Sequence, residues 1–190
     1  MSWFARLLLS STIGAGALAA LQARSASQGA PLPPTQSDPR PAPAWSNASW
    51  LSVEQPVSLA SLRDRVVLLN FWVFTCYNCT NTVPSLVRFD EQYRDRGLTI
   101  IGIHTPEFPP YAGEHDRANV ARALTKYHIQ YANAQDNDRR TWNLYGIRYW
   151  PSFVLIDKSG TIRHEGAGEF HVGDRNHQRW EQRIRSLLDE

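Results

Sequence analysis

The chain has too few cysteines for a disulfide framework. It holds only two among its 190 residues, Cys76 and Cys79, and two cannot complete a four-thiolate zinc site either. Their spacing alone leaves three interpretations open: a redox couple, half of a mixed cysteine and histidine metal site, or two inert buried thiols. The six histidines show no metal-ligand spacing with one another or with the cysteine pair. This favours the redox couple, and we expect no metal and no cofactor.

The chain also lacks an excess of charge of either sign. It carries 20 basic and 18 acidic residues, a formal net charge of +2. Because residues 1–43 hold three arginines and one aspartate, the rest of the chain carries 17 residues of each sign. No basic stripe with interleaved aromatic residues occurs, so we expect no nucleic-acid partner.

The first 23 residues contain a long uncharged run. Arg6 is followed by Leu7 to Ala23 without a charge, in a stretch rich in Leu, Ala, Gly and Ser. A charged start before an apolar run is typical of a secretory signal. At a rise of ~1.5 Å per residue the run spans roughly 25 Å, the short end for crossing a bilayer. Residues 1–23 are therefore expected to be a signal peptide or an uncleaved membrane anchor. In either case we expect the domain that follows to be exported.

Residues 24–43 are predicted to form a linker. They hold six prolines in a polar stretch, which favours extended, semi-rigid polyproline geometry. The folded domain is then expected over residues 44–190, a length that suits one domain.

Apolar periodicity in this domain predicts strands that alternate with helices. The expected strands are Trp50–Leu51, Val66–Trp72, Leu98–His104, Tyr131–Ala134, Ser152–Asp157 and Thr161–Glu165. The expected helices run from Cys79 to Arg96, from Asp116 to His128, from a cap at Asp138 to Gly146, and from Asp174 to Leu188. The alternation favours an α/β fold with a central mixed sheet flanked by helices.

The cysteine pair directly follows the apolar strand Val66–Trp72, at the start of a predicted helix. The N-terminus of a helix stabilises a thiolate through unpaired backbone N–H groups and the helix dipole. Cys76, at the exposed first position, is therefore the expected nucleophile, and Cys79 the thiol that resolves the mixed disulfide. A spacing of three residues places both sulfurs on one face of the helix, within bonding reach.

Several blocks of the sequence resemble a known family. The stretch Asn70–Cys79, with Pro84 inside the helix, resembles the active-site segment of the thioredoxin superfamily, and Tyr149–Asp157 resembles its cis-proline loop. Residues 101–108 and 136–145 are similar to exported, membrane-linked TlpA-like reductases, and above all to the thioredoxin-like domain of DipZ-type proteins. The resemblance implies a thioredoxin-like fold from about Trp45 to the C-terminus.

The resemblance also implies roles for single residues. It gives Cys76 as the nucleophile, Cys79 as the resolving thiol and Pro151 as the cis-proline that faces them. The residues expected to line the substrate cleft are Trp72, Tyr77, Asn78 and Trp150.

The sequence departs from the thioredoxin pattern at one position. Many thioredoxins carry a buried aspartate six residues before the first cysteine, which accepts the proton of the resolving thiol. Here that position is Asn70, which cannot titrate. Glu107, in the Thr-Pro-Glu-Phe loop, is the predicted substitute, and a solvated loop carboxylate without a role is the alternative.

Together these features predict an exported thiol–disulfide oxidoreductase that reduces protein disulfides by dithiol exchange. The dipeptide Tyr77-Asn78 carries no charge and no histidine, which favours a reducing couple. The resemblance implies a periplasmic or cell-envelope location, a membrane thiol electron donor of the DsbD or CcdA kind, and disulfide-bearing clients such as apocytochrome c. Two alternatives remain open: a disulfide-forming oxidant, and a non-enzymatic copper- or haem-handling protein that uses the cysteine pair.

A peroxidase is the weakest alternative. Peroxidatic sites on related folds place a threonine and a proline just ahead of the reactive cysteine, and here only Thr75 is present.

Overall fold

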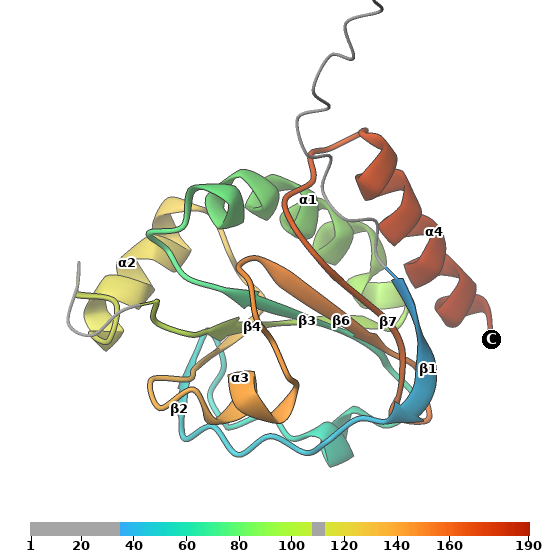
Figure 1. Cartoon of the computed structure of the whole chain (residues 1–190), viewed down its shortest axis with the longest axis horizontal. Coiled ribbons are helices and arrows are strands. Elements are labelled where there is room, and N and C mark those ends of the chain that lie inside the picture. Colours follow the sequence, from blue (N-terminus) through green and yellow to red (C-terminus); the bar gives the residue numbers. More distant parts are fainter. Residues whose placement is uncertain (1–34, 108–112) are drawn as a thin grey trace, which may run out of the picture. The chain divides into compact units, whose positions relative to one another are not determined.

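A computed structural model describes residues 35–107 and 113–190 (Figure 1). The expected signal or anchor segment and residues 24–34 of the expected linker lie outside these residues. Within the described ranges no helix is both long and apolar enough to cross a membrane.

The described residues form one mixed sheet with the strand order β1-β7-β6-β3-β4-β5-β2. The strands are β1 (Thr35–Pro41), β2 (Ser49–Leu51), β3 (Val66–Trp72), β4 (Leu98–His104), β5 (Ala132–Gln135), β6 (Ser152–Ile156) and β7 (Thr161–Ala167). The central strand β3 pairs in parallel with β4 and antiparallel with β6. The mixed sheet predicted from the sequence is therefore confirmed.

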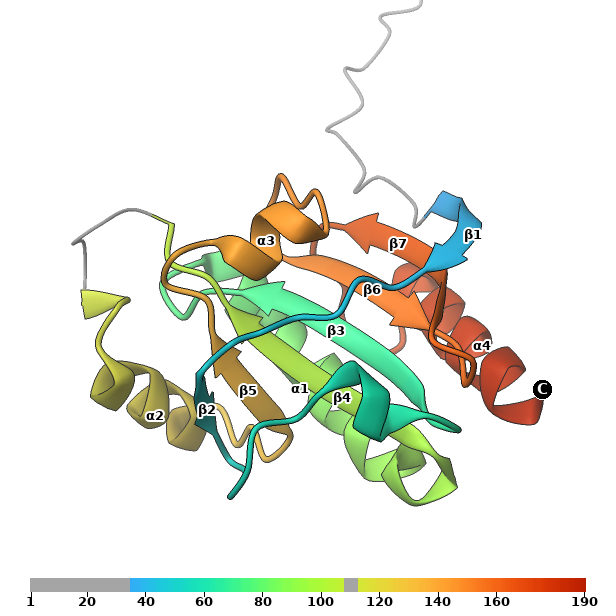
Figure 2. The same cartoon turned by 90° about the horizontal axis from the view of Figure 1, so that it is seen from below.

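Helices cover both faces of the sheet (Figures 1 and 2). The helices are α1 (Tyr77–Tyr93), α2 (Arg117–Lys126), α3 (Arg140–Leu144) and α4 (Arg175–Asp189), with short 3-10 turns at Leu59–Leu62 and Arg94–Arg96. Buried side chains of α1, α2 and α4 form one core against the sheet. Those of α3 and of the segment before β3 form a second core on the opposite face.

The two cores explain why six of the seven residues of β3 are apolar. Side chains alternate along a strand, so Leu68 and Trp72 enter the core beneath α1, whereas Leu69 and Phe71 enter the core beneath α3. All seven residues of β3 are buried. A strand covered on both faces has no solvated side and needs no polar alternation.

The folded domain begins earlier than the sequence predicted. β1 pairs antiparallel with β7, so residues 35–41 of the expected linker belong to the sheet. Two prolines fit this strand because it lies at the edge of the sheet, where a missing N–H can face away from the single neighbour. The guanidinium of Arg40 holds both oxygens of Glu165, at 2.9 and 2.6 Å, and joins the two strands by their side chains.

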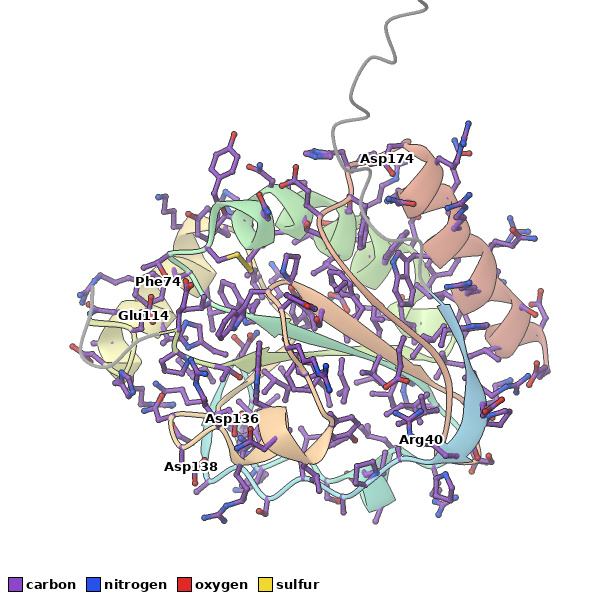
Figure 3. The ribbon with its side chains drawn as sticks, viewed as in Figure 1. Arg40, Phe74, Glu114, Asp136, Asp138 and Asp174 are labelled. Atoms are coloured by element: carbon purple, nitrogen blue, oxygen red, sulfur yellow. A yellow bond between two sulfur atoms is a disulfide. The ribbon has the colours of Figure 1, made fainter. Side chains whose placement is uncertain are left out.

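Two aspartates cap the start of α3, and the sequence predicted one of them. The buried carboxylate of Asp136 accepts hydrogen bonds from the amides of Thr141 and Trp142, at 2.9 and 2.8 Å. Asp136 further accepts the hydroxyl of Thr105 at 3.2 Å. Asp138, the predicted cap, accepts the amide of Arg140 at 3.2 Å, but it is exposed and also pairs with the Arg140 guanidinium at the surface. Asp136 therefore joins the loop after β4 to the start of α3 (Figure 3).

We predict that Asp136→Ala lowers the free energy of unfolding by about 2–3 kcal/mol, because it leaves buried donors without an acceptor. Asp138→Ala is the matched control, and its loss should stay within about 0.5 kcal/mol because the position is exposed. Urea unfolding followed by circular dichroism measures both. Equal losses in the two variants would contradict the assignment of Asp136 as the cap.

Candidate functional site

The cysteine pair is held by a tight turn between β3 and α1. The amide of Cys76 donates to the carbonyl of Val73 at 3.2 Å and closes the turn Val73–Cys76. Cys76 then serves as the N-cap of α1, and its sulfur accepts the amide of Cys79 at 3.2 Å. The two cysteines form a disulfide with their Cα atoms 5.2 Å apart, drawn as the yellow bond in Figure 3.

The two sulfurs differ in access. Cys79 is 2% exposed and belongs to the core beneath α1. Cys76 is only partly buried and packs at the margin of that core. A partner can therefore reach Cys76 first, which agrees with its expected role as the nucleophile. The helix N-terminus supplies the field that stabilises its thiolate when the pair is reduced.

A buried histidine at the end of β4 supports the turn from below. The amide of Phe74 donates to Nε2 of His104 at 3.4 Å, and the Phe74 ring stacks on the imidazole with centroids 5.4 Å apart. Trp72 meets the same imidazole edge-on at 5.3 Å. Burial lowers the pKa of His104 to about 3, so the ring is neutral and can accept this bond. The only sign of this contact in the sequence is the place of His104 at the end of a predicted strand.

A buried carboxylate holds the turn from the side. The hydroxyl of Thr75, the residue before Cys76, donates to one oxygen of Glu114. The amide of Glu107 donates to the other oxygen at 2.7 Å. Glu114 is only 3% exposed although it lies in a loop, and Figure 3 shows it close to Phe74. The sequence analysis missed Glu114 because nothing in the local pattern marks a loop glutamate as buried.

Glu107, the predicted proton acceptor, lies in the same loop with a half-buried side chain. The carbonyl of Glu107 accepts a hydrogen bond from the guanidinium of Arg139, which fixes the backbone at this position. Among the described residues its carboxylate has no hydrogen-bond partner, and its predicted role stays a prediction. Asn70 is 1% exposed and lies near Tyr131. Burial raises the pKa of Tyr131, and the Asn70 side chain offsets a part of this rise.

The loop before β6 lies beside the cysteine turn. Ser152 pairs with Phe71, which places Pro151 next to the end of β3, where the turn begins. The Trp150–Pro151 peptide bond is cis, as expected. The indole of Trp150 donates to the carbonyl of Thr105 at 3.1 Å and stacks on Trp142 at 4.1 Å. Trp150 therefore links the cis-proline loop to the loop that carries Glu107.

The expected cleft residues are only partly where the sequence placed them. Tyr77 is 76% exposed beside Cys76, and Asn78 is exposed too. Trp72 is a correction: it is fully buried, and its indole donates to Asn133 at 3.0 Å. It therefore packs beneath the site and does not line a cleft, because it lies on the face of β3 that α1 covers. Tyr149, at the start of the cis-proline loop, is 64% exposed and was not among the residues expected to line the cleft.

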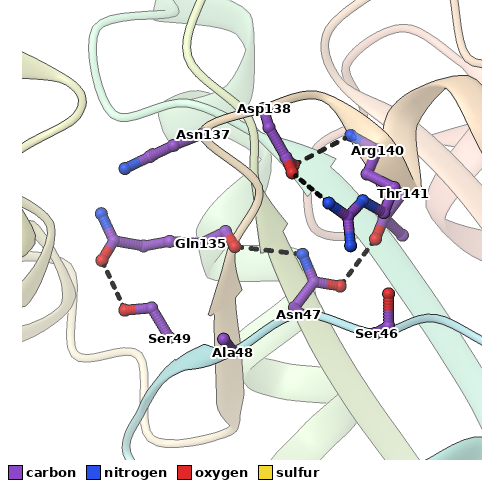
Figure 4. A pocket seen from close by; sticks show the side chains of 9 residues that line it. All are labelled: Ser46, Asn47, Ala48, Ser49, Gln135, Asn137, Asp138, Arg140 and Thr141. Carbon is purple, nitrogen blue, oxygen red and sulfur yellow. Dashed lines mark hydrogen bonds and ion pairs between the residues drawn. The ribbon is translucent and has the colours of Figure 1, made fainter.

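A polar pocket of about 320 Å³ lies beside α3 (Figure 4). The amide of Asn47 donates to the carbonyl of Gln135 at 3.0 Å, and Thr141 donates to Asn47 at 2.6 Å. These bonds tie the segment before β2 to β5 and α3. None of the lining residues is a predicted site residue, so we interpret this pocket as structural. Within residues 35–107 and 113–190, no three His, Cys, Asp or Glu side chains group closely enough to hold a metal ion.

Comparison with known proteins gives a family and several relatives. The sequence matches the AhpC/TSA family over residues 40–165. It is 43% identical to the protein DipZ of Mycobacterium tuberculosis over 127 residues, which are 65% of this chain and 18% of DipZ. It is 23% identical to the thiol-disulfide oxidoreductase YkuV of Bacillus subtilis, over 67% of this chain and 80% of YkuV. The chain thus spans less than a fifth of DipZ and most of YkuV.

Solved structures show the fold. A protein of the thioredoxin-like superfamily superposes with a TM-score of 0.70 and 23% identity, over 79% of this chain and 97% of that protein. A thiol:disulfide interchange protein from Chlorobium tepidum superposes with a TM-score of 0.60 and 26% identity, over 81% of this chain and 99% of that protein. The thioredoxin-like fold expected from the sequence is confirmed.

We predict that His104 makes the domain sensitive to acid. Its folded pKa of about 3 lies below the unfolded value of about 6.5, so the unfolded chain binds the extra proton as the pH falls. The stability contributed by the neutral ring is complete above pH ~6.5 and is lost below it, by roughly 2 kcal/mol between pH 7 and pH 5.

The test compares urea unfolding at these two pH values in wild type and in His104→Gln. The variant keeps an acceptor for the Phe74 amide, and its loss between pH 7 and pH 5 should be smaller by roughly 2 kcal/mol. His171→Gln, at an exposed position, is the control and should keep the wild-type slope. An unchanged slope in His104→Gln would show that His104 is not the group responsible.

Proposed function

The chain belongs to the AhpC/TSA family, and we propose that it is an exported thiol–disulfide oxidoreductase that reduces disulfides in client proteins. One observation carries the proposal: the only two cysteines are joined across the first turn of α1, with the accessible Cys76 at the helix N-terminus. Such a pair can store and release two electrons without any bound cofactor. The likeness of the chain to YkuV, named as a thiol-disulfide oxidoreductase, supports the same activity.

The reaction follows from the accessibility of the two sulfurs. In the reduced protein the Cys76 thiolate attacks one sulfur of the client disulfide, and the other client sulfur leaves as a thiolate and takes up a proton. Cys79 then loses its proton and attacks the sulfur of Cys76, which releases the second client thiol. The client has gained two electrons and two protons. The protein is left with the Cys76–Cys79 disulfide, the state that the structure holds.

The surroundings of Cys76 suit a protein substrate. Tyr77, Tyr149 and Val172 are large apolar side chains that are 76%, 64% and 47% exposed. The loop with Val172 follows β7, and the amide of Gly168, the first residue after β7, donates to the carbonyl of Pro151 at 2.9 Å. We propose that an extended client segment pairs with the backbone of Trp150, the half-buried residue before Pro151, and contacts Tyr77 and Asn78. Backbone beside a strand can pair with a peptide in this way.

The location and the electron donor are part of the same proposal. The charged start and uncharged run of residues 1–23 support export, to the periplasmic or cell-envelope side of a membrane, with the segment either cleaved or kept as an anchor. Because the nicotinamide-dependent reductants are cytosolic, a membrane dithiol carrier of the DsbD or CcdA kind must return the disulfide to the dithiol. Clients of the apocytochrome c type fit this pathway.

We predict that Cys79→Ser accumulates a covalent adduct with a disulfide-bearing client, because Cys76 can still attack but nothing resolves the mixed disulfide. Cys76→Ser, which removes the accessible sulfur, is the matched control and should form almost none. Non-reducing electrophoresis after incubation with insulin measures the adduct, and dithiothreitol should release it. Equal adducts in both variants, or none in either, would refute the assigned order of the two cysteines.

The direction of electron flow is a separate prediction. We expect the Cys76–Cys79 couple to equilibrate with glutathione at a potential well below about −180 mV, so that it reduces clients. A higher potential would favour the disulfide-forming oxidant. Tight binding of Cu(I) by the reduced protein, without disulfide exchange, would favour the copper-handling alternative.

A further inference from the structure

A buried carboxylate binds the residue before the nucleophile, and the mechanism above does not use it. Glu114 comes from the loop before α2 and reaches the turn Val73–Cys76 from 39 residues away in sequence. Both of its oxygens act as acceptors, one for the hydroxyl of Thr75 and the other for the amide of Glu107. It is 3% exposed, so water screens its charge poorly.

The bond to Glu114 determines which hydrogen bond the Thr75 hydroxyl can make with Cys76. A hydroxyl has a single proton to donate. Because Thr75 gives that proton to Glu114, it can accept from the Cys76 thiol but cannot donate to the thiolate. A thiolate is stabilised by hydrogen-bond donors and destabilised by a nearby negative charge. Glu114 engages the only proton of the Thr75 hydroxyl and adds a negative charge to the site. Both effects oppose the ionisation of Cys76, whereas the helix N-terminus favours it.

We propose that Glu114 is a positioning residue that acts through Thr75 to disfavour the Cys76 thiolate and so poises the pair as a reductant. The inference rests on the proposed function and gives it a direction. A couple whose thiolate is stabilised is a stronger oxidant, because its reduced form is favoured. Withholding a donor from Cys76 and placing a carboxylate nearby shift the balance toward the disulfide, and the dithiol then gives up its electrons more readily.

The other charged groups around Glu114 are engaged elsewhere. The guanidinium of Arg139 binds the carbonyls of Pro106 and Glu107 and lies over the rings of Trp142 and Trp150. Burial keeps His104 neutral, and the adjacent His115 lowers the pKa of His104 further. Asp116 is exposed and caps α2 through the amide of Ala118. Glu114 is thus the buried carboxylate in this group.

The test uses the full chain and compares two charge-removing variants of the same loop. Glu114→Gln should lower the pH midpoint of Cys76 alkylation by iodoacetamide by about one unit. It should also shift the glutathione equilibrium about tenfold toward the dithiol. Asp116→Asn is the matched control, because Asp116 is exposed and caps α2, and asparagine keeps that cap. It should leave both values unchanged.

A second pair of variants tests the route through Thr75. In a Thr75→Val background the hydroxyl is gone, so Glu114→Gln should shift the alkylation midpoint by clearly less than in the wild-type background. Thr75→Ser keeps the hydroxyl and should restore the full shift. A role of Glu114 in stability alone would change unfolding but not the midpoint.

Each outcome decides the inference. An unchanged midpoint in folded Glu114→Gln, or a shift that is the same with and without the Thr75 hydroxyl, would overturn it. An equal effect of Asp116→Asn would overturn it too. If Glu114→Gln does not fold, Glu114→Met removes the charge with a similar length and should give the same shift. Failure of the wild-type pair to exchange with glutathione or insulin would instead refute the proposed function itself.

Discussion

The turn Val73–Cys76 is the constraint on which the site depends. It must pass from a strand buried on both faces to a helix whose first residue faces solvent, within four residues. The turn is fixed by its own backbone bond from Cys76 to Val73, by the imidazole under Phe74 and by the carboxylate beside Thr75. These three contacts come from three segments, so the accessible sulfur is positioned by the sheet and the loops together.

The sheet brings the remaining parts of the site to the same end of β3. β4 ends at His104 and β6 begins at Ser152, and both strands pair with β3 next to the turn. The register therefore sets Pro151 beside the end of β3 and His104 beneath Phe74. Trp150 closes the group by its bond to Thr105, the residue after β4. A shift of one residue in either pairing would reverse the faces of these side chains.

The buried carboxylate of Glu114 is a feature that could be predicted from the sequence only in part. The departure at Asn70 raised the question of which carboxylate serves the cysteine pair, and Glu107 was the predicted one. The structure shows another glutamate of the same loop, Glu114, in contact with the turn. Both are loop glutamates in a polar, proline-rich stretch, and only the path of the backbone decides which of the two is buried.

The sequence by itself determined the features that depend on local pattern. The apolar run of β3, the spacing of Cys76 and Cys79, and the alternation of strands and helices predicted the sheet, the nucleophile and the fold. Tertiary structure alone decided the pairing of β1 with β7, the burial of Trp72 and the bond between Thr75 and Glu114. These features join residues far apart in sequence, and such contacts depend on register and loop path, which a local pattern of residues does not specify.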